Sequence, residues 1–294
     1  MTQPAATLRY DVVDVFTDRP FAGNPLAVVH DAGALSTGQL QAIAREFNLS
    51  ETAFPLPPSA AGADYHVRIF TPAAELAFAG HPSVGTAWVL ARDKAIGYGE
   101  VVQECGAGLL PLVVDAEGAR LTGGTPVVRG DLDPGPLLAA VGLEPDDLDG
   151  AAPAGMAAAG ADFAFLAVHD TAVSRARPDQ AAIGSLDVRQ GFVLFSFDRQ
   201  RRRAHVRMFT PALGVPEDPA TGSAAVALGV FLVWRGLLTG DGESAFVIHQ
   251  GAEIGRPSTL DCTAVAAAGA AVRTTVRGGV VPVASGEIVI PSPG

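Results

Sequence analysis

Several residue types are scarce in this chain of 294 residues, and each scarcity excludes a class of protein. There is one lysine, Lys94, and no Gly-rich loop leads from it into a helix. This disfavours a Schiff base with pyridoxal phosphate and a P-loop for nucleoside triphosphates. The two cysteines, Cys105 and Cys262, form no disulfide framework and no CxxC metal pattern. A reduced, cytoplasmic compartment is the default expectation.

Basic residues and long apolar runs are also in short supply. Lys and Arg number 20 against 31 Asp and Glu, which gives a net charge of −11. We therefore expect no nucleic acid and no anionic membrane as partner. The longest apolar run, 224–234, is too short to span a bilayer, and residues 1–7 do not resemble a signal peptide. Six histidines without close paired spacing predict no metal site.

The sequence does contain an internal repeat. HVRIFTPA at His66–Ala73 returns as HVRMFTPA at His205–Ala212, 139 residues later. A weaker echo, LAVVHD at Leu26–Asp31 and LAVHD at Leu166–Asp170, starts 140 residues apart. Two matches at nearly one offset, close to half the chain length, indicate a duplication.

Each repeat predicts strands followed by a buried helix. Short β-prone runs at 52–56 and 191–197 precede the repeated octapeptide, which suggests a hairpin in each half. Helical patterns follow at Pro82–Leu90 and Pro219–Trp234, the second with Asp218 as its expected N-cap. The second helix is apolar nearly all round, so its own sheet should wrap it.

We therefore predict an α+β protein of two similar domains, each a mixed β-sheet curled around a central α-helix. The linker falls near Gly123–Pro126, so the first domain is 1–123 and the second is 124–283, and a strand at about 284–294 is the candidate to complete the first domain. Two like domains commonly enclose a cleft. If both helix N-termini face that cleft, Gly80 and Gly222 let backbone N–H groups approach a carboxylate.

Long ordered motifs place the chain near a known family. It resembles the PhzF-like phenazine-biosynthesis family, which shares the diaminopimelate-epimerase fold, and the resemblance covers nearly the whole chain. The matching segments are DVFTDRPFAGNPLAVV (14–29), REFNLSETAF (45–54), RIFTPAAELAFAGHPSVGTA (68–87), EDPATGSAA (217–225) and QGAEIGRPS (250–258).

The resemblance implies roles for individual residues. The glutamate of the NLSET motif, Glu51, is expected to move a proton between carbons of a small carboxylic acid. His81, Asp218 and Ser223 are expected to bind substrate polar groups, with Asn24 as a further contact. It also implies a homodimer. The apolar neighbours of Glu51 would raise the pKa of its carboxyl, and one base that returns the proton needs no cofactor.

Plainer interpretations stay open at each of these positions. Glu51 fits the first turn of a helix capped by Ser50, and Asp218 fits a simple cap. His81 fits a packed turn and Ser223 a first-turn hydroxyl without a ligand. The simplest roles of some other residues are structural: His66 and His205 in strands, Arg199 and Arg201–Arg203 in a solvated turn, Cys105 and Cys262 in the core.

Two other functions remain open. Epimerases and racemases of this fold use two cysteines at the helix N-termini, but this chain has Ala79 and Pro219–Ala220 in those turns, so a single-carboxylate isomerase is preferred. The alternatives are an amino-acid racemase or epimerase and a non-catalytic protein that binds a small acid.

Overall fold

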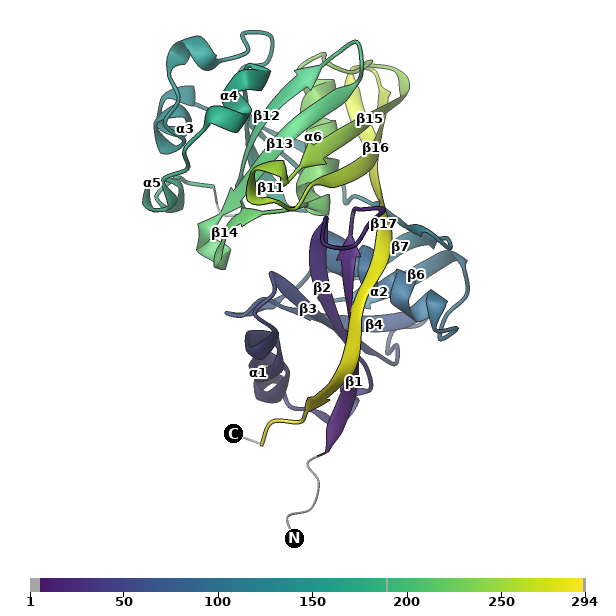
Figure 1. Cartoon of the computed structure of the whole chain (residues 1–294). Helices are drawn as coiled ribbons and strands as arrows, with labels where there is room; N and C mark the ends of the chain where they lie inside the picture. The colour runs from purple at the N-terminus through teal and green to yellow at the C-terminus, as the bar shows by residue number, and fades with distance from the viewer. Residues whose placement is uncertain (1–5, 189, 293–294) are drawn as a thin grey trace. The chain divides into compact units, whose positions relative to one another are not determined.

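The chain divides into two units in a computed structural model that describes residues 6–188 and 190–292 (Figure 1). Unit 1 comprises Met1–Leu121 and Gly278–Gly294, and unit 2 comprises Thr122–Arg277. The last strand, β17 (Ala270–Val289), drawn in yellow, contributes residues to both units. The sequence placed the boundary two residues later and expected a shorter C-terminal contribution to the first domain.

Unit 1 is a mixed sheet. Its strands pair in the order β17–β1–β2–β3–β4–β6–β7–β8, and β8 pairs back onto β17. The elements of unit 1 before β17 are β1 (Thr7–Val15), β2 (Asn24–Val29), η1 (Ala32–Ala34), α1 (Thr37–Phe47), β3 (Glu51–Leu56), β4 (Tyr65–Phe70), β5 (Glu75–Leu76), α2 (Gly80–Arg92), β6 (Gly99–Cys105), β7 (Gly108–Val114) and β8 (Gly118–Thr122).

Unit 2 is built in the same way. Its strands pair in the order β9–β10–β11–β12–β13–β15–β16–β17. The elements of unit 2 before β17 are β9 (Pro126–Asp131), α3 (Pro134–Ala140), η2 (Pro145–Asp147), β10 (Gly155–Ala159), β11 (Asp162–Ala167), α4 (Asp170–Arg175), α5 (Gln180–Gly184), β12 (Phe192–Asp198), β13 (Arg203–Thr210), η3 (Pro211–Leu213), β14 (Val215–Asp218), α6 (Gly222–Trp234), β15 (Gly242–Gln250), η4 (Ala252–Ile254) and β16 (Ser258–Ala267).

The two sheets share one pattern of strand directions. Read in these orders, the third and fifth pairings are parallel in both units, β2 with β3 and β4 with β6, then β11 with β12 and β13 with β15. The other pairings between neighbours in these two orders are antiparallel. The repeated octapeptide begins in β4 and β13, which are equivalent strands. The sequence repeat therefore corresponds to a repeated topology.

A buried helix packs against the strands of each unit. In α2 every residue from Gly80 to Ala91 is buried, and the helix contacts β1, β2, β3 and β7. In α6 the buried residues extend to Val233, and the helix contacts β9, β10, β11 and β16. Phe231 of α6 packs on Phe165 and Phe195 with ring centroids 5.0 and 5.6 Å apart. None of the helices in the described ranges combines the length and hydropathy needed to cross a membrane.

Three local interpretations of the sequence are wrong. The predicted helix start at Pro219 comes too early, because α6 begins at Gly222 with Thr221 as its N-cap. Asp218 ends β14 and pairs with Met208 of β13, so it caps no helix. Glu51 is the first residue of β3, which excludes the interpretation as a helix start capped by Ser50.

A glycine contact joins β8 to β17 within unit 1. A Cβ on Gly118 would lie 1.9 Å from the carbonyl oxygen of Gly278, so only glycine allows this approach. The Phe16 ring packs against Gly278 itself, since a Cβ on Gly278 would lie 2.1 Å from Phe16 Cδ1. Beside this contact, the N–H of Val280 donates to the carbonyl oxygen of Glu117 at 2.9 Å, an ordinary hydrogen-bond distance.

An imidazole joins three elements of unit 2. His205 of β13 lies with Nε2 2.8 Å from Glu253 Oε1 in η4 and with Nδ1 3.3 Å from Asp170 Oδ1 in α4. The hydrogen bond to Glu253, with a smaller contribution from Asp170, raises the pKa of His205 although burial opposes it. The same hydrogen bond lowers the pKa of Glu253 to about 2.

The glycine contact predicts a large loss of stability for one methyl group. Gly118→Ala should lower the free energy of unfolding by about 3 kcal/mol, because a backbone carbonyl cannot turn aside as a side chain can. Gly97→Ala is the matched control, since a Cβ there meets nothing within 4 Å. Urea unfolding of both variants measures the difference. Equal midpoints would show that β8 and β17 can separate at no cost.

The His205 pair predicts a pH dependence of stability. A raised folded pKa means that His205 stabilises the fold below its ordinary pKa of 6.5 and that this contribution is lost as the pH rises through the folded pKa. Between pH 6 and 9 the melting temperature of the wild type should therefore fall about 1–3 °C more than that of His205→Gln. His66→Gln, the same change in the first repeat, should follow the wild type. Identical slopes for wild type and His205→Gln would contradict the pairing.

Candidate active site

Glu51 and His81 lie together in unit 1. Glu51 starts β3, beside Leu26 of β2, and its side chain is 15% exposed. Its Oε2 lies 3.6 Å from Nε2 of His81, the second residue of α2, whose side chain is 4% exposed. The parallel pairing of β2 with β3 and the buried helix thus bring a carboxyl and an imidazole within reach of one small molecule.

The protonation state of His81 follows from its contacts. Burial lowers the pKa of His81 to about 3, although a hydrogen bond to the backbone of Pro25 opposes this. Proline has no N–H, so the ring donates to the Pro25 carbonyl. Nε2 makes no hydrogen bond to any described residue, which assigns the donor to Nδ1. His81 is therefore a neutral imidazole that presents an acceptor nitrogen toward Glu51.

Buried hydrogen bonds hold these two residues in place. Asn24 is fully buried, and its Oδ1 accepts from Ser50 Oγ at 3.0 Å, immediately before Glu51. Ser83 in the first turn of α2 donates to the Ala79 carbonyl at 2.9 Å and accepts from Gln103 Nε2 at 2.8 Å. These contacts give Asn24 a positioning role; its contact with a substrate stays a prediction.

Unit 2 places a second polar group at the start of α6. Asp218 is 8% exposed, and one of its carboxylate oxygens accepts from the hydroxyl of Thr221. Gln250, which ends β15, donates from Nε2 to the Asp218 carbonyl at 2.8 Å and to the Thr221 hydroxyl at 3.1 Å. The sequence predicted a role for Asp218 but gave none to Thr221 or Gln250.

Both buried helices begin without a side-chain cap. The N-cap of α2 is Ala79, which has no polar side chain, and the N-cap of α6 is Thr221, whose hydroxyl bonds Asp218 instead of the helix. Gly80 and Gly222 are the first helical residues, and Ser223, half-buried, follows Gly222. First-turn N–H groups that no side chain caps are suited to a carboxylate ligand.

In each unit an arginine binds a glutamate of the short strand that precedes the buried helix, and the sequence analysis gave this pair no role. Arg207 donates from Nε and Nη2 to the two oxygens of Glu217, at 2.9 and 2.8 Å. Arg68 holds Glu75 in the same way, with both distances 2.7 Å. Each arginine lies 5.2 Å from the centre of the phenylalanine ring two residues on. The sequence feature that could have predicted these pairs is the arginine that both copies of the octapeptide contain, Arg68 and Arg207.

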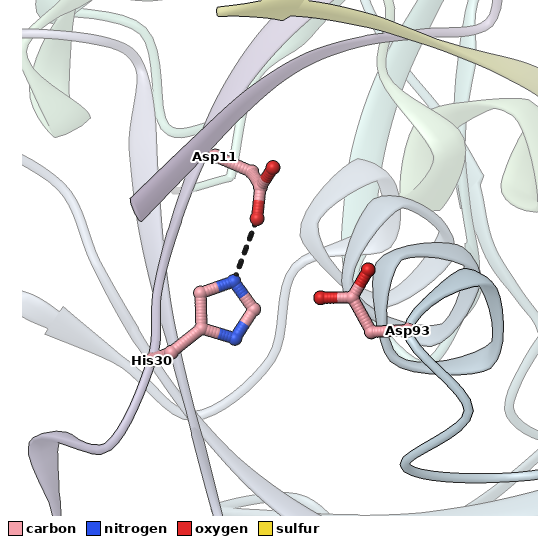
Figure 2. Close-up of side chains that lie close together, drawn as sticks. All are labelled: Asp11, His30 and Asp93. Carbon is pink, nitrogen blue, oxygen red and sulfur yellow. Dashed lines mark hydrogen bonds and ion pairs between the residues drawn. The ribbon is translucent and has the colours of Figure 1, made fainter. Parts of the chain in front are cut away.

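Asp11, His30 and Asp93 form the group with metal-ligand character in the described chain, and Figure 2 shows them converging. Two arginines form ion pairs with the carboxylates of Asp11 and Asp93. Arg9 lies 3.1 Å from Asp11 and 2.7 Å from Asp93, and Arg92 lies 3.0 and 2.8 Å from the same two residues. A cation would have to displace both guanidinium groups. The cluster is therefore a charge-balanced network that ties β1 to the end of α2.

The two thiols lie within strands. Cys105 ends β6 and Cys262 lies in β16, and both are buried. Burial raises the pKa of Cys262, which disfavours its thiolate. Neither cysteine belongs to the first turn of α2 or α6.

Comparison with known proteins agrees with this architecture. The family model of phenazine biosynthesis-like proteins (PhzC-PhzF) matches residues 13–286. An uncharacterized isomerase of Mesorhizobium japonicum is 36% identical, over 97% of this chain and 99% of the relative. A trans-2,3-dihydro-3-hydroxyanthranilate isomerase of Pseudomonas chlororaphis is also 36% identical, over 96% and 99%.

Solved structures share the fold. A PhzF-family phenazine biosynthesis protein of Bacillus anthracis superposes with a TM-score of 0.87 at 26% identity, over 97% of this chain and 100% of that one. A probable proline racemase of Agrobacterium radiobacter gives 0.69 at 14% identity, over 97% and 94%, which is a likeness of fold alone. The mixed α+β fold predicted from the sequence is thus confirmed. The chain belongs to the PhzF family of phenazine biosynthesis-like proteins and is an isomerase of that family.

Proposed function

We propose that this isomerase moves a proton between carbons of a small carboxylic acid, with Glu51 as the single acid/base and without a cofactor. The observation that carries the proposal is the largely buried Glu51 carboxyl facing the neutral His81 ring, 3.6 Å away. The Glu51 carboxylate takes a proton from one carbon, the double bond shifts, and the same carboxyl returns the proton to another carbon. No atoms or electrons enter or leave, so the step balances without a co-reactant.

His81 complements Glu51 in this reaction. Its Nε2 is an acceptor, and burial keeps the ring neutral at physiological pH. An acceptor at this place can hold a hydroxyl or amino proton of the substrate, or the proton on Glu51 between removal and return. A neutral ring also leaves the negative charge of Glu51 available for proton removal, since no imidazolium pairs with it.

We propose that the substrate carboxylate lies at the uncapped helix starts. The backbone N–H groups of Gly222 and Ser223, and the Ser223 hydroxyl, supply donors in unit 2, and Gly80 does so in unit 1. The proposal requires that Asp218, Ser223 and Glu51 act on one substrate, which is what the resemblance to the family implies for these residues. We propose different parts for the two carboxyls, because Glu51 faces the His81 imidazole whereas Asp218 accepts from the Thr221 hydroxyl.

The names of relatives suggest a first substrate. Curated relatives from three Pseudomonas species are trans-2,3-dihydro-3-hydroxyanthranilate isomerases, at 35–36% identity. We propose a small unsaturated or amino carboxylic acid, with this compound as the first to test. The homodimer and the cytoplasmic location expected from the sequence stay predictions.

A racemase or epimerase is the alternative from the same fold. Such enzymes would need a second base on the opposite face of the substrate, and the buried strand thiols Cys105 and Cys262 are poor candidates. Full activity after thiol alkylation would exclude them. A protein that binds the acid without exchanging its protons is the other alternative. The following experiment distinguishes such a protein from the proposed isomerase.

Replacement of Glu51 by its amide should abolish proton exchange. Glu51→Gln should slow deuterium incorporation from D₂O into trans-2,3-dihydro-3-hydroxyanthranilate by about 10²- to 10⁴-fold, because an amide cannot take the proton. The melting temperature should stay within a few degrees, since the amide keeps the size of the side chain. NMR of the substrate follows the exchange.

The matched control is Glu46→Gln, an exposed glutamate in α1. It should exchange at the wild-type rate. Wild-type exchange in Glu51→Gln would overturn the assignment of the base. Binding in a thermal-shift assay across a panel of such acids, with no exchange in any of them, would favour the non-catalytic alternative.

A further inference from the structure

Thr221 is an N-cap residue that does not cap its helix. Threonine in this position usually accepts a hydrogen bond from an N–H of the first turn. Here its hydroxyl donates to the Asp218 carboxylate instead. Since a hydroxyl has one proton, the direction of this bond depends on what else Thr221 accepts.

Gln250 fixes that direction. Its Oε1 accepts from the Thr221 N–H at 3.4 Å, and its Nε2 donates to the Asp218 carbonyl at 2.8 Å. One backbone donor and one backbone acceptor together set the orientation of the amide. The same Nε2 also donates to the Thr221 hydroxyl at 3.1 Å. The hydroxyl therefore accepts from Gln250, and its proton points to Asp218.

The backbone around Gln250 packs closely against the segment that contains Asp218 and Pro219. Gln250 is 3% exposed and ends β15, where it pairs with Val206 of β13. The next residue, Gly251, has φ +80°, and a Cβ there would lie 2.4 Å from the Arg256 carbonyl oxygen and 2.6 Å from that of Pro219. This close approach holds the residue after β15 against Pro219, which follows Asp218. The Gln250 side-chain amide therefore has little freedom to move.

We propose that Gln250 and Thr221 are positioning residues that keep Asp218 as an ionised hydrogen-bond acceptor in one fixed orientation. A hydroxyl donor stabilises the charged form of a carboxylate. Asp218 held in this way accepts from an N–H or O–H group and repels a second carboxylate. Resting on the proposed function, this makes Asp218 the group that selects an acid carrying an amino or hydroxyl donor beside its carboxylate.

The test removes one hydroxyl group, which donates to Asp218 and accepts from Gln250. Thr221→Val keeps the shape of the side chain but loses the hydroxyl, and Thr221→Ser restores it. Carbon-13 NMR of the Asp218 carboxyl, assigned with Asp218→Asn, should give a titration midpoint at higher pH in Thr221→Val and at the wild-type pH in Thr221→Ser. This measurement needs no substrate.

Activity provides a second reading. In Thr221→Val, kcat/KM for trans-2,3-dihydro-3-hydroxyanthranilate should fall at least about tenfold, with the acid limb of its pH profile moved to higher pH, and Thr221→Ser should recover most of it. Gln250→Glu, of equal size, should behave like Thr221→Val, because it offers the hydroxyl a competing acceptor and cannot donate to the Asp218 carbonyl.

Thr274→Val is the matched control. Thr274 is buried in unit 2, and its hydroxyl has no hydrogen-bond partner among the described residues. In Thr274→Val, the titration midpoint of the Asp218 carboxyl and kcat/KM should equal those of the wild type. Glu217, which precedes Asp218, and its partner Arg207 are unchanged in every variant.

Two results would overturn the inference. One is a wild-type midpoint in both Thr221→Val and Gln250→Glu. The other is a Thr221→Ser variant that loses as much as Thr221→Val, which would mean that the site tolerates no change in shape. Exchange that survives in Glu51→Gln would instead refute the proposed function, and the carboxyl titration would still decide the role of Thr221.

Discussion

The burial of a helix against the strands of its own unit is the constraint on which the arrangement of this protein depends. The apolar, nearly fully buried faces of α2 and α6 prevent either helix from shifting or turning without exposing its core residues. The first turn of each helix is therefore fixed to the precision of a packed core. Residues at that turn, His81 in one unit and Ser223 in the other, take up positions that a loop could not hold as firmly.

The duplication supplies the same frame twice, and the two copies have diverged at the helix start. The arginine–glutamate pair remains in both, Arg68 with Glu75 and Arg207 with Glu217, because it fastens the strand that precedes the helix. The second residue of the helix is a histidine in α2 and a serine in α6, and the N-cap is Ala79 or Thr221. Retained packing with altered polar groups permits one unit to provide proton transfer while the other provides recognition, as we propose.

The sequence predicted the features that depend on local pattern. The repeated octapeptide located β4 and β13, and the apolar run at 224–234 located a buried helix. It misplaced the start of α6 because Pro219 after Asp218 imitates a capped first turn, whereas the pairing of Asp218 with Met208 keeps this segment extended. The contacts of Gln250 were not predictable, since they require the parallel register of β13 and β15 and the close approach of Gly251 to Pro219.

The state of His81 has a consequence for the division of labour in the proposed reaction. With Nδ1 bound to the Pro25 carbonyl and a pKa of about 3, the ring has no proton to give from Nε2 at neutral pH. A proton that reaches the substrate must then come from another group, and Glu51 is the titratable group that lies against this nitrogen. In the mechanism that we propose, the same carboxyl removes the proton and returns it, which gives an isomerisation on one face of the substrate rather than an inversion that needs a second base on the other.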